Sequence, residues 1–142
     1  MEFYTDISLE KAIECRQVKQ AAHCALFYKE VVEKKDSCNK LSSAFFLMQI
    51  RSDGMIGFPG GYVDEEITDS SAILVGLNRE LKEEINFSEE PMNMENYVCS
   101  HYKSECDDPL IVHFFAKQLS KKQFENIEKS HMTAIHFPSE SL

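Results

Sequence analysis

A glycine-rich turn followed by a helix crowded with carboxylates constrains this chain more than any other feature. Residues 57–61 read GFPGG, and residues 79–84 read RELKEE. Glu80, Glu83 and Glu84 follow the spacing i, i+3, i+4, so a helix places them on one face, where like charges repel. A face that tolerates this repulsion is typical of a cation site, and Mg²⁺ and Mn²⁺ prefer such oxygen ligands.

The glycine turn supplies the backbone part of the same predicted site. Gly60 and Gly61 let the main chain approach closely and aim a carbonyl toward the helix. A carbonyl and two or three carboxylates can hold divalent ions that polarise a pyrophosphate and activate water. Arg79 adjoins the cluster and can orient one carboxylate. Because RELKEE alone is usually a solvated face and GG alone is usually a turn, the interpretation depends on both motifs occurring in this order.

The rest of the chain alternates predicted strands and helices. Strands are expected at residues 21–28, 44–51, 97–102 and 110–119, and helices at 9–19, from Ser70 or Ser71 to about Glu84, and from Ser120 to about 129. The final HMTAIHFPSESL includes a short strand. This mixed order predicts one layered α/β or α+β domain over residues 1–142. His113 lies in an apolar strand, where a hydrogen-bonded core or edge histidine is favoured over a ligand.

Composition excludes several classes of protein. The net charge of −9 argues against nucleic-acid binding through a basic surface, so metal ions would have to supply positive charge to an RNA or nucleotide site. No apolar run approaches eighteen residues, so no membrane association is expected, and the acidic N-terminus is unlike a secretory signal. Five cysteines without CxxC spacing indicate reduced thiols in the cytosol or nucleus.

The two motifs together resemble the Nudix box, G-x5-E-x7-R-E-U-x-E-E-x-G-U, where U is a bulky aliphatic residue. Gly61 matches the opening glycine, and residues 79–84 match R-E-U-x-E-E. The spacer is longer here, so the first glutamate has no clean match among residues 65–67. Asn86 replaces the last glycine, and asparagine also tolerates the left-handed end of a helix. The resemblance implies a Nudix-type α/β/α sandwich with a mixed sheet.

The stretches FLMQIRSDGMIGFPGGYVD and GLNRELKEE resemble, more narrowly, the nuclear snoRNA-decapping Nudix hydrolases, which also act as inosine diphosphatases. This likeness implies hydrolysis of capped RNA or of inosine di- and triphosphates, with Mg²⁺ or Mn²⁺ as cofactor. It also implies a homodimer located in the nucleus (nucleolus and nucleoplasm) and in the cytoplasm. The alternatives are a non-catalytic RNA- or protein-binding member of the fold, and an inactive truncated form. Family members continue beyond Glu128 with another strand and a C-terminal helix, so residues 130–142 are expected to diverge and to lack both elements.

The resemblance also assigns roles to single residues. Glu80 and Glu84 are the expected metal ligands, Glu83 is a further ligand or the base that prepares water, and Gly60 offers its carbonyl to the metal. The implied substrate-binding residues are His23, Arg51, Phe58 and His101. Phe58 would stack on a base, and Arg51 would bind a phosphate or a base edge. His23 lies one place before Cys24, which aligns with the family's histidine, and in a strand that shift reverses the face.

Overall fold

The computed structural model describes residues 4–33, 40–51, 53–104, 108–129 and 133–140. It is a mixed α/β structure, as expected, and consists of two compact units. The first comprises Met1–Cys24 and Pro59–Ala116, and the second comprises Ala25–Phe58 and Lys117–Leu142. Strands β2 (Lys19–Glu33) and β7 (Leu110–Gln118) contribute residues to both.

Antiparallel strands form the sheet of the first unit. Strand β6 (Tyr97–Lys103) lies between β1 (Tyr4–Asp6) and β7 and pairs with both. Strand β5 (Gly60–Tyr62) pairs with the beginning of β2, which places Gly60 opposite His23. The residues around the glycine turn therefore form a short strand as well as a turn. Strands of three residues carry too little periodicity to be predicted, because their pairing depends on tertiary contacts.

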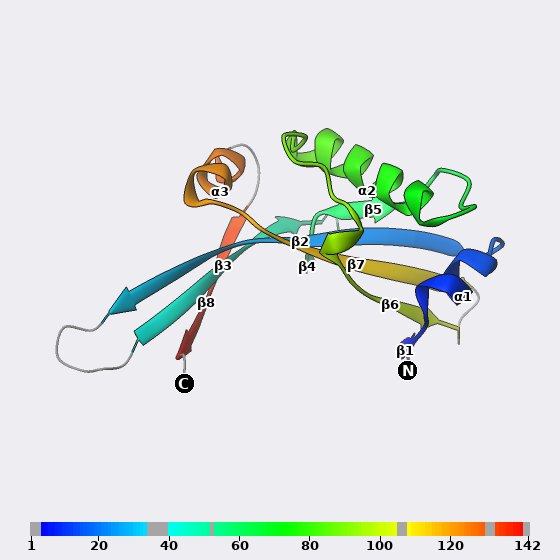
Figure 1. Ribbon diagram of the computed structural model, residues 1–142, viewed down its shortest axis with the longest axis horizontal. Coiled ribbons are helices and arrows are strands. Elements are labelled where there is room, and N and C mark those ends of the chain that lie inside the picture. Colours follow the sequence, from blue (N-terminus) through cyan, green and yellow to red (C-terminus); the bar gives the residue numbers. More distant parts are fainter. Residues whose placement is uncertain (1–3, 34–39, 52, 105–107, 130–132, 141–142) are drawn as a thin grey trace. The chain divides into compact units, whose positions relative to one another are not determined.

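Helix α2 (Ser70–Ile85) agrees with the predicted carboxylate helix and lies beside β5 in Figure 1. The predicted cap, Ser70 or Ser71, is wrong: Asp69 caps the helix, and its carboxylate accepts a 2.9 Å hydrogen bond from the Ser71 N–H. Asn86 ends the helix with φ 54°, in the left-handed conformation expected of it. The buried face consists of Ile73, Gly76, Leu77, Leu81 and Ile85.

Helix α1 (Leu9–Glu14) is shorter than the predicted 9–19, because the chain turns after Cys15 and β2 begins at Lys19. A single turn of 3-10 helix, η1 (Met94–Asn96), precedes β6 and was not predicted. Both short helices begin at a polar cap, Ser8 for α1 and Asn93 for η1.

His113 is a fully buried core histidine, as predicted. Its Nε2 lies 2.7 Å from Gln20 Oε1, and its Nδ1 lies 2.6 Å from the hydroxyl of Ser100. Ser100 in turn lies 2.6 Å from the hydroxyl of Tyr97, and Gln20 donates to the carbonyl of Ala12. Burial lowers the pKa of His113 to about 4, so the ring is neutral at physiological pH.

The second unit is built around β3 (Lys40–Ile50). This strand pairs antiparallel with the end of β2, from Phe27 opposite Phe46 onward, and also with β4 (Ile56–Gly57). Helix α3 (Lys121–Glu128) belongs to the same unit. Ser120 caps it as predicted, in a capping box with Gln123.

The short strand expected in the final residues is present, which corrects the expectation from the resemblance that no strand follows α3. Strand β8 (Thr133–Glu140) pairs antiparallel with β3, from Thr133 opposite Met48 to Glu140 opposite Leu41. The sequence TAIHF favours a strand, and β3 provides the edge on which it pairs. In the described residues no helix follows α3. None of the helices in those same residues is both long and apolar enough to span a membrane.

Candidate active site

Arg79 contacts four carboxylates, which come from two segments of the first unit. Its Nε donates to Glu65 Oε1 at 2.8 Å, and one Nη lies 3.3 Å from Asp64 Oδ2. Its other Nη lies 3.2 Å from Glu80 Oε1 and 3.4 Å from Glu83 Oε2. The predicted orienting role for Arg79 is therefore borne out, and it extends from one carboxylate to four. The loop before α2 and the C-terminal half of α2 are joined through one guanidinium group.

Glu65 is the residue of this cluster that the sequence left unassigned. Its hydrogen bond with Arg79 is the main cause that lowers its pKa, against the opposing effect of burial. Its second oxygen, Oε2, is buried and has no hydrogen-bond partner in the described part of the chain. A Cβ atom at Gly76 would lie 2.9 Å from that oxygen, so the glycine leaves the space that Glu65 fills. The signal in the sequence was only that Glu65 lies in the region of the Nudix pattern's first glutamate, without matching its position.

Glu84 contacts the glycine turn directly. The N–H of Gly60 donates to Glu84 Oε2 at 3.2 Å. Burial is the main cause that raises the pKa of Glu84; the neighbouring Glu80 and Glu83 carboxylates raise it further, and the hydrogen bond from Gly60 opposes them. The turn and the helix, paired in the prediction by their order in the sequence, are thus in contact. The backbone group that contacts the helix is the Gly60 N–H, and the metal-binding role of its carbonyl stays a prediction.

Both glycines of the turn are required by their surroundings. Gly60 has φ 141°, which side-chain-bearing residues avoid, and a Cβ there would lie 2.1 Å from the Ala22 carbonyl oxygen. A Cβ at Gly61 would lie 2.9–3.1 Å from the carboxylate atoms of Glu80. The absence of a side chain at Gly61 therefore lets the Glu80 carboxylate lie against the turn.

The donor atoms fit a hard divalent cation, although the described side chains do not converge on one point. No group of three or more His, Cys, Asp or Glu residues within the described ranges is arranged to hold a metal ion. Glu80 and Glu83 each direct an oxygen to Arg79, while Glu84 directs one to the Gly60 N–H. Burial is the main cause of the raised pKa of Glu84, and repulsion from Glu80 and Glu83 adds to it; a cation among these carboxylates would offset both effects.

Two predicted substrate residues lie in the first unit, at different places. His23 is half-buried opposite Gly60, whereas the next residue, Cys24, points into the core, with Sγ 3.6 Å from Met92 Sδ. The one-residue offset therefore leaves His23 on the opposite face from Cys24, as strand geometry requires. His101 pairs with Asp6 of β1, with Nε2 3.1 Å from Oδ1, and is not joined to the carboxylates of α2.

The other two predicted substrate residues belong to the second unit. Arg51 is exposed and lies 3.5 Å from Asp53 Oδ2, in the turn that joins β3 to β4. Phe58 packs edge-on against Phe46, with ring centroids 6.3 Å apart. Their roles in binding a nucleotide stay predictions.

A mixed α/β chain with a glycine turn against an R-E-x-x-E-E helix has the features of a Nudix domain. The model of the Nudt16-like family, described as U8 snoRNA-decapping enzyme-like, matches residues 20–142, and this chain belongs to that family. The match includes the tail that follows α3.

Curated relatives carry two different names. The chain is 37% identical over 125 residues to a U8 snoRNA-decapping enzyme of Homalodisca vitripennis, covering 87% of this chain and 63% of that protein. It is 39% identical over 84 residues to the Mus musculus enzyme of that name, covering 58% of this chain and 40% of the relative. It is also 35% identical over 92 residues to the Tudor-interacting repair regulator protein of Gallus gallus, covering 63% of this chain and 26% of that protein. The chain therefore spans less than two thirds of the length of each.

Proposed function

We propose that this chain hydrolyses a phosphoanhydride bond in a nucleoside diphosphate linkage, in a reaction that depends on Mg²⁺ or Mn²⁺. One observation carries the proposal: Arg79 positions Glu80 and Glu83 while the Gly60 N–H positions Glu84, so three carboxylates lie in fixed places beside a glycine turn. Membership of a family described as U8 snoRNA-decapping enzyme-like supports it. The candidate substrates are the 5′ cap of RNA and inosine di- or triphosphates.

The charge of the site explains why a cation is needed. Four carboxylates (Asp64, Glu65, Glu80 and Glu83) contact the guanidinium of Arg79, and Glu84, on the same helix as Arg79, contacts the Gly60 N–H; together the six side chains carry four net negative charges when all are ionised. A polyphosphate would be repelled from such a surface. Bound divalent cations would offset this repulsion, polarise the phosphate and lower the pKa of bound water.

The residues divide into ligands and positioning groups. Glu80 and Glu84 would hold the cation with the Gly60 carbonyl, and Glu83 would be a further ligand or the base that accepts a proton from water. Arg79 would keep Glu80 and Glu83 in place through Nη contacts of 3.2 and 3.4 Å. Glu65 would keep Arg79 in place through its 2.8 Å hydrogen bond.

The remaining parts of the proposal follow from the resemblance. His23, Arg51, Phe58 and His101 would contact the substrate, with Phe58 stacking on the base. We further propose a homodimer and a nuclear location.

The decisive experiment measures Mn²⁺-dependent hydrolysis of capped RNA and of inosine diphosphate by the same preparation. Wild type is compared with Glu84→Gln, which removes one charge and preserves size, and with Glu89→Gln, an exposed control outside the site. We expect turnover that requires metal, that Glu84→Gln abolishes and that Glu89→Gln retains. The two substrates are ranked by their kcat/KM values. Equal activity in Glu84→Gln would refute the proposed site.

A binding role is the second candidate, because some relatives are named for an interaction with a Tudor protein. Absence of turnover on both substrates, from a chain that is soluble and melts cooperatively, would favour this role. The retention of all three glutamates in the α2 motif favours hydrolysis.

A further inference from the structure

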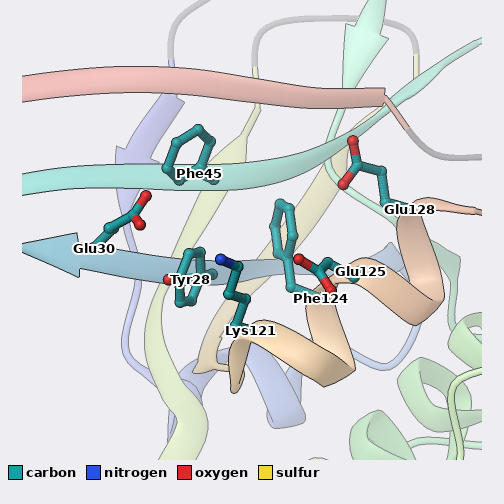
Figure 2. A pocket seen from close by; sticks show the side chains of 7 residues that line it. All are labelled: Tyr28, Glu30, Phe45, Lys121, Phe124, Glu125 and Glu128. Atoms are coloured by element: carbon teal, nitrogen blue, oxygen red, sulfur yellow. The ribbon is translucent and has the colours of Figure 1, made fainter.

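A small cavity in the second unit is lined by both aromatic rings and carboxylates, and it has no part in the proposed hydrolysis (Figure 2). Its volume is about 270 Å³. Pockets for drug-sized ligands are usually larger, about 300–1,000 Å³. The cavity therefore suits a single side chain better than a whole nucleotide.

Three aromatic side chains from three elements form one wall of this cavity. Tyr28 of β2 and Phe45 of β3 are stacked, with ring centroids 6.0 Å apart and an angle of 25° between the rings. Phe124 of α3 packs against both, at 6.0 Å from Tyr28 and 6.4 Å from Phe45. Phe124 is buried, whereas Tyr28 and Phe45 are half-buried and keep surface toward the cavity. Aromatic faces carry partial negative charge and attract cations.

The charged residues around the cavity are mainly acidic. Glu30, Glu125 and Glu128 line it together with Lys121, which gives a net charge of −2 when all four are ionised. Figure 2 shows the Lys121 ammonium group beside Tyr28, with Glu30 on one side and Glu125 and Glu128 on the other. Within the described chain no ion pair joins Lys121 to any of these glutamates. The carboxylates are thus available to a cation from outside.

The order of charges along α3 places two of the cavity's carboxylates toward the C-terminal end of the helix. Lys121 and Lys122 begin the helix, and Glu125 and Glu128 lie in its second half, with Glu128 as its last residue. A helix is stabilised by the opposite order, with acidic residues first and basic residues last. Lys129 already places one positive charge at the C-cap, and a cation bound in the cavity beside Glu125 and Glu128 would add to its stabilising effect.

We propose that this cavity, the aromatic–carboxylate pocket, binds the cationic side chain of an arginine or a methylated lysine in a basic peptide of a partner protein. The rings would contact the cation face-on, and Glu30, Glu125 and Glu128 would neutralise its charge. The Lys121 ammonium lies where the ligand's charge would lie, so it competes with the ligand. A nucleotide is disfavoured, because three carboxylates repel its phosphates.

The test is calorimetric titration of the full chain with three peptides that differ at one central position. The central residue is trimethyllysine, arginine or the neutral norleucine. We expect the two cationic peptides to bind and the norleucine peptide to bind roughly tenfold more weakly or not at all. The ratio of the first two affinities shows which cation the pocket prefers.

Substitutions in the pocket are expected either to weaken or to strengthen peptide binding. Glu30→Gln should weaken the cationic peptides a few-fold, and Tyr28→Leu about tenfold, whereas Tyr28→Phe should retain binding. Lys121→Gln should strengthen binding, because it removes the competing charge, and Lys122→Gln is its matched control outside the lining. Should Tyr28→Leu not fold, the Glu30 and Lys121 variants still decide the question.

Three results would overturn the proposal. The first is a norleucine peptide that binds as tightly as the cationic peptides, and the second is weaker peptide binding by Lys121→Gln. A capped RNA oligonucleotide that displaces the peptide and itself depends on Lys121 would instead identify the pocket as an anion site.

Discussion

His113 should make the stability of the fold depend on pH between about 4 and 6.5. The ring is fully buried between Gln20 and Ser100, both neutral partners, and burial lowers its pKa to about 4 from an ordinary value of 6.5. Between these two pH values, the unfolded chain therefore binds a proton at His113 that the folded chain does not bind. Stability is complete above pH 6.5 and falls as the pH is lowered toward 4.

The loss of folding stability can be calculated from the difference between the two pKa values of His113. At about 1.36 kcal/mol per pH unit, the full window between 6.5 and about 4 corresponds to about 3 kcal/mol. About 2 kcal/mol of it should already be lost at pH 5. Because small proteins are stabilised by only ~5–15 kcal/mol, this loss is readily measured.

The assay is urea denaturation at pH 7.5 and pH 5.0, followed by circular dichroism, on wild type and His113→Gln. Glutamine can still donate and accept a hydrogen bond but cannot titrate. Wild type should lose about 2 kcal/mol more than the variant on acidification. His101→Gln is the control: this half-buried residue pairs with an exposed Asp6, so the variant should show nearly the wild-type loss. An equal acid loss in wild type and His113→Gln would refute the assignment of His113 as a buried neutral group.

Three further substitutions test the site and the helix that carries it. Gly61→Ala should lower turnover at least roughly tenfold with little loss of stability, because its Cβ would lie 2.9–3.1 Å from the Glu80 carboxylate; wild-type kcat would contradict this geometry. Arg79→Lys should also lower kcat at least roughly tenfold, since an ammonium cannot reproduce the forked contacts to Glu65 and Glu80. Retained kcat in this variant would show that the forked geometry is dispensable. Asn86→Ala should cost about 1 kcal/mol in urea denaturation, because φ is 54° there, whereas Asn86→Gly should be near neutral; equal loss in both would point to the asparagine side chain instead.

The longer elements could be predicted because periodicity and caps are local properties. The extent of α2 and the left-handed Asn86 were both readable from the sequence, and so were the strands of residues 97–102 and 110–119. The cap was misplaced by one or two residues, because Asp69, Ser70 and Ser71 are all good caps and the choice among them depends on the conformation of the loop. Strand β8 was underestimated, because its stability depends on pairing with β3, far away in the sequence.

The sequence predicted the glutamates of the site better than it predicted the contacts that position them. The spacing of Glu80, Glu83 and Glu84 indicated a shared face, and their order after the glycines indicated the turn that Glu84 contacts. Nothing local could show that Arg79 reaches back to Asp64 and Glu65, fourteen or fifteen residues earlier, because that contact depends on how the loop folds over α2.

The contacts at the two ends of this loop have a consequence for how its length can vary. Glu65 is held by Arg79 at one end, and Asp69 caps α2 at the other. Residues 66–68 lie between these two anchors, in the spacer that is longer than the Nudix pattern. Lengthening a surface loop between fixed ends costs little, since closure entropy grows slowly with length. Insertions and deletions at residues 66–68 should therefore leave the glutamates of α2 in register with the glycine turn, which makes this loop a suitable place to insert a reporter sequence.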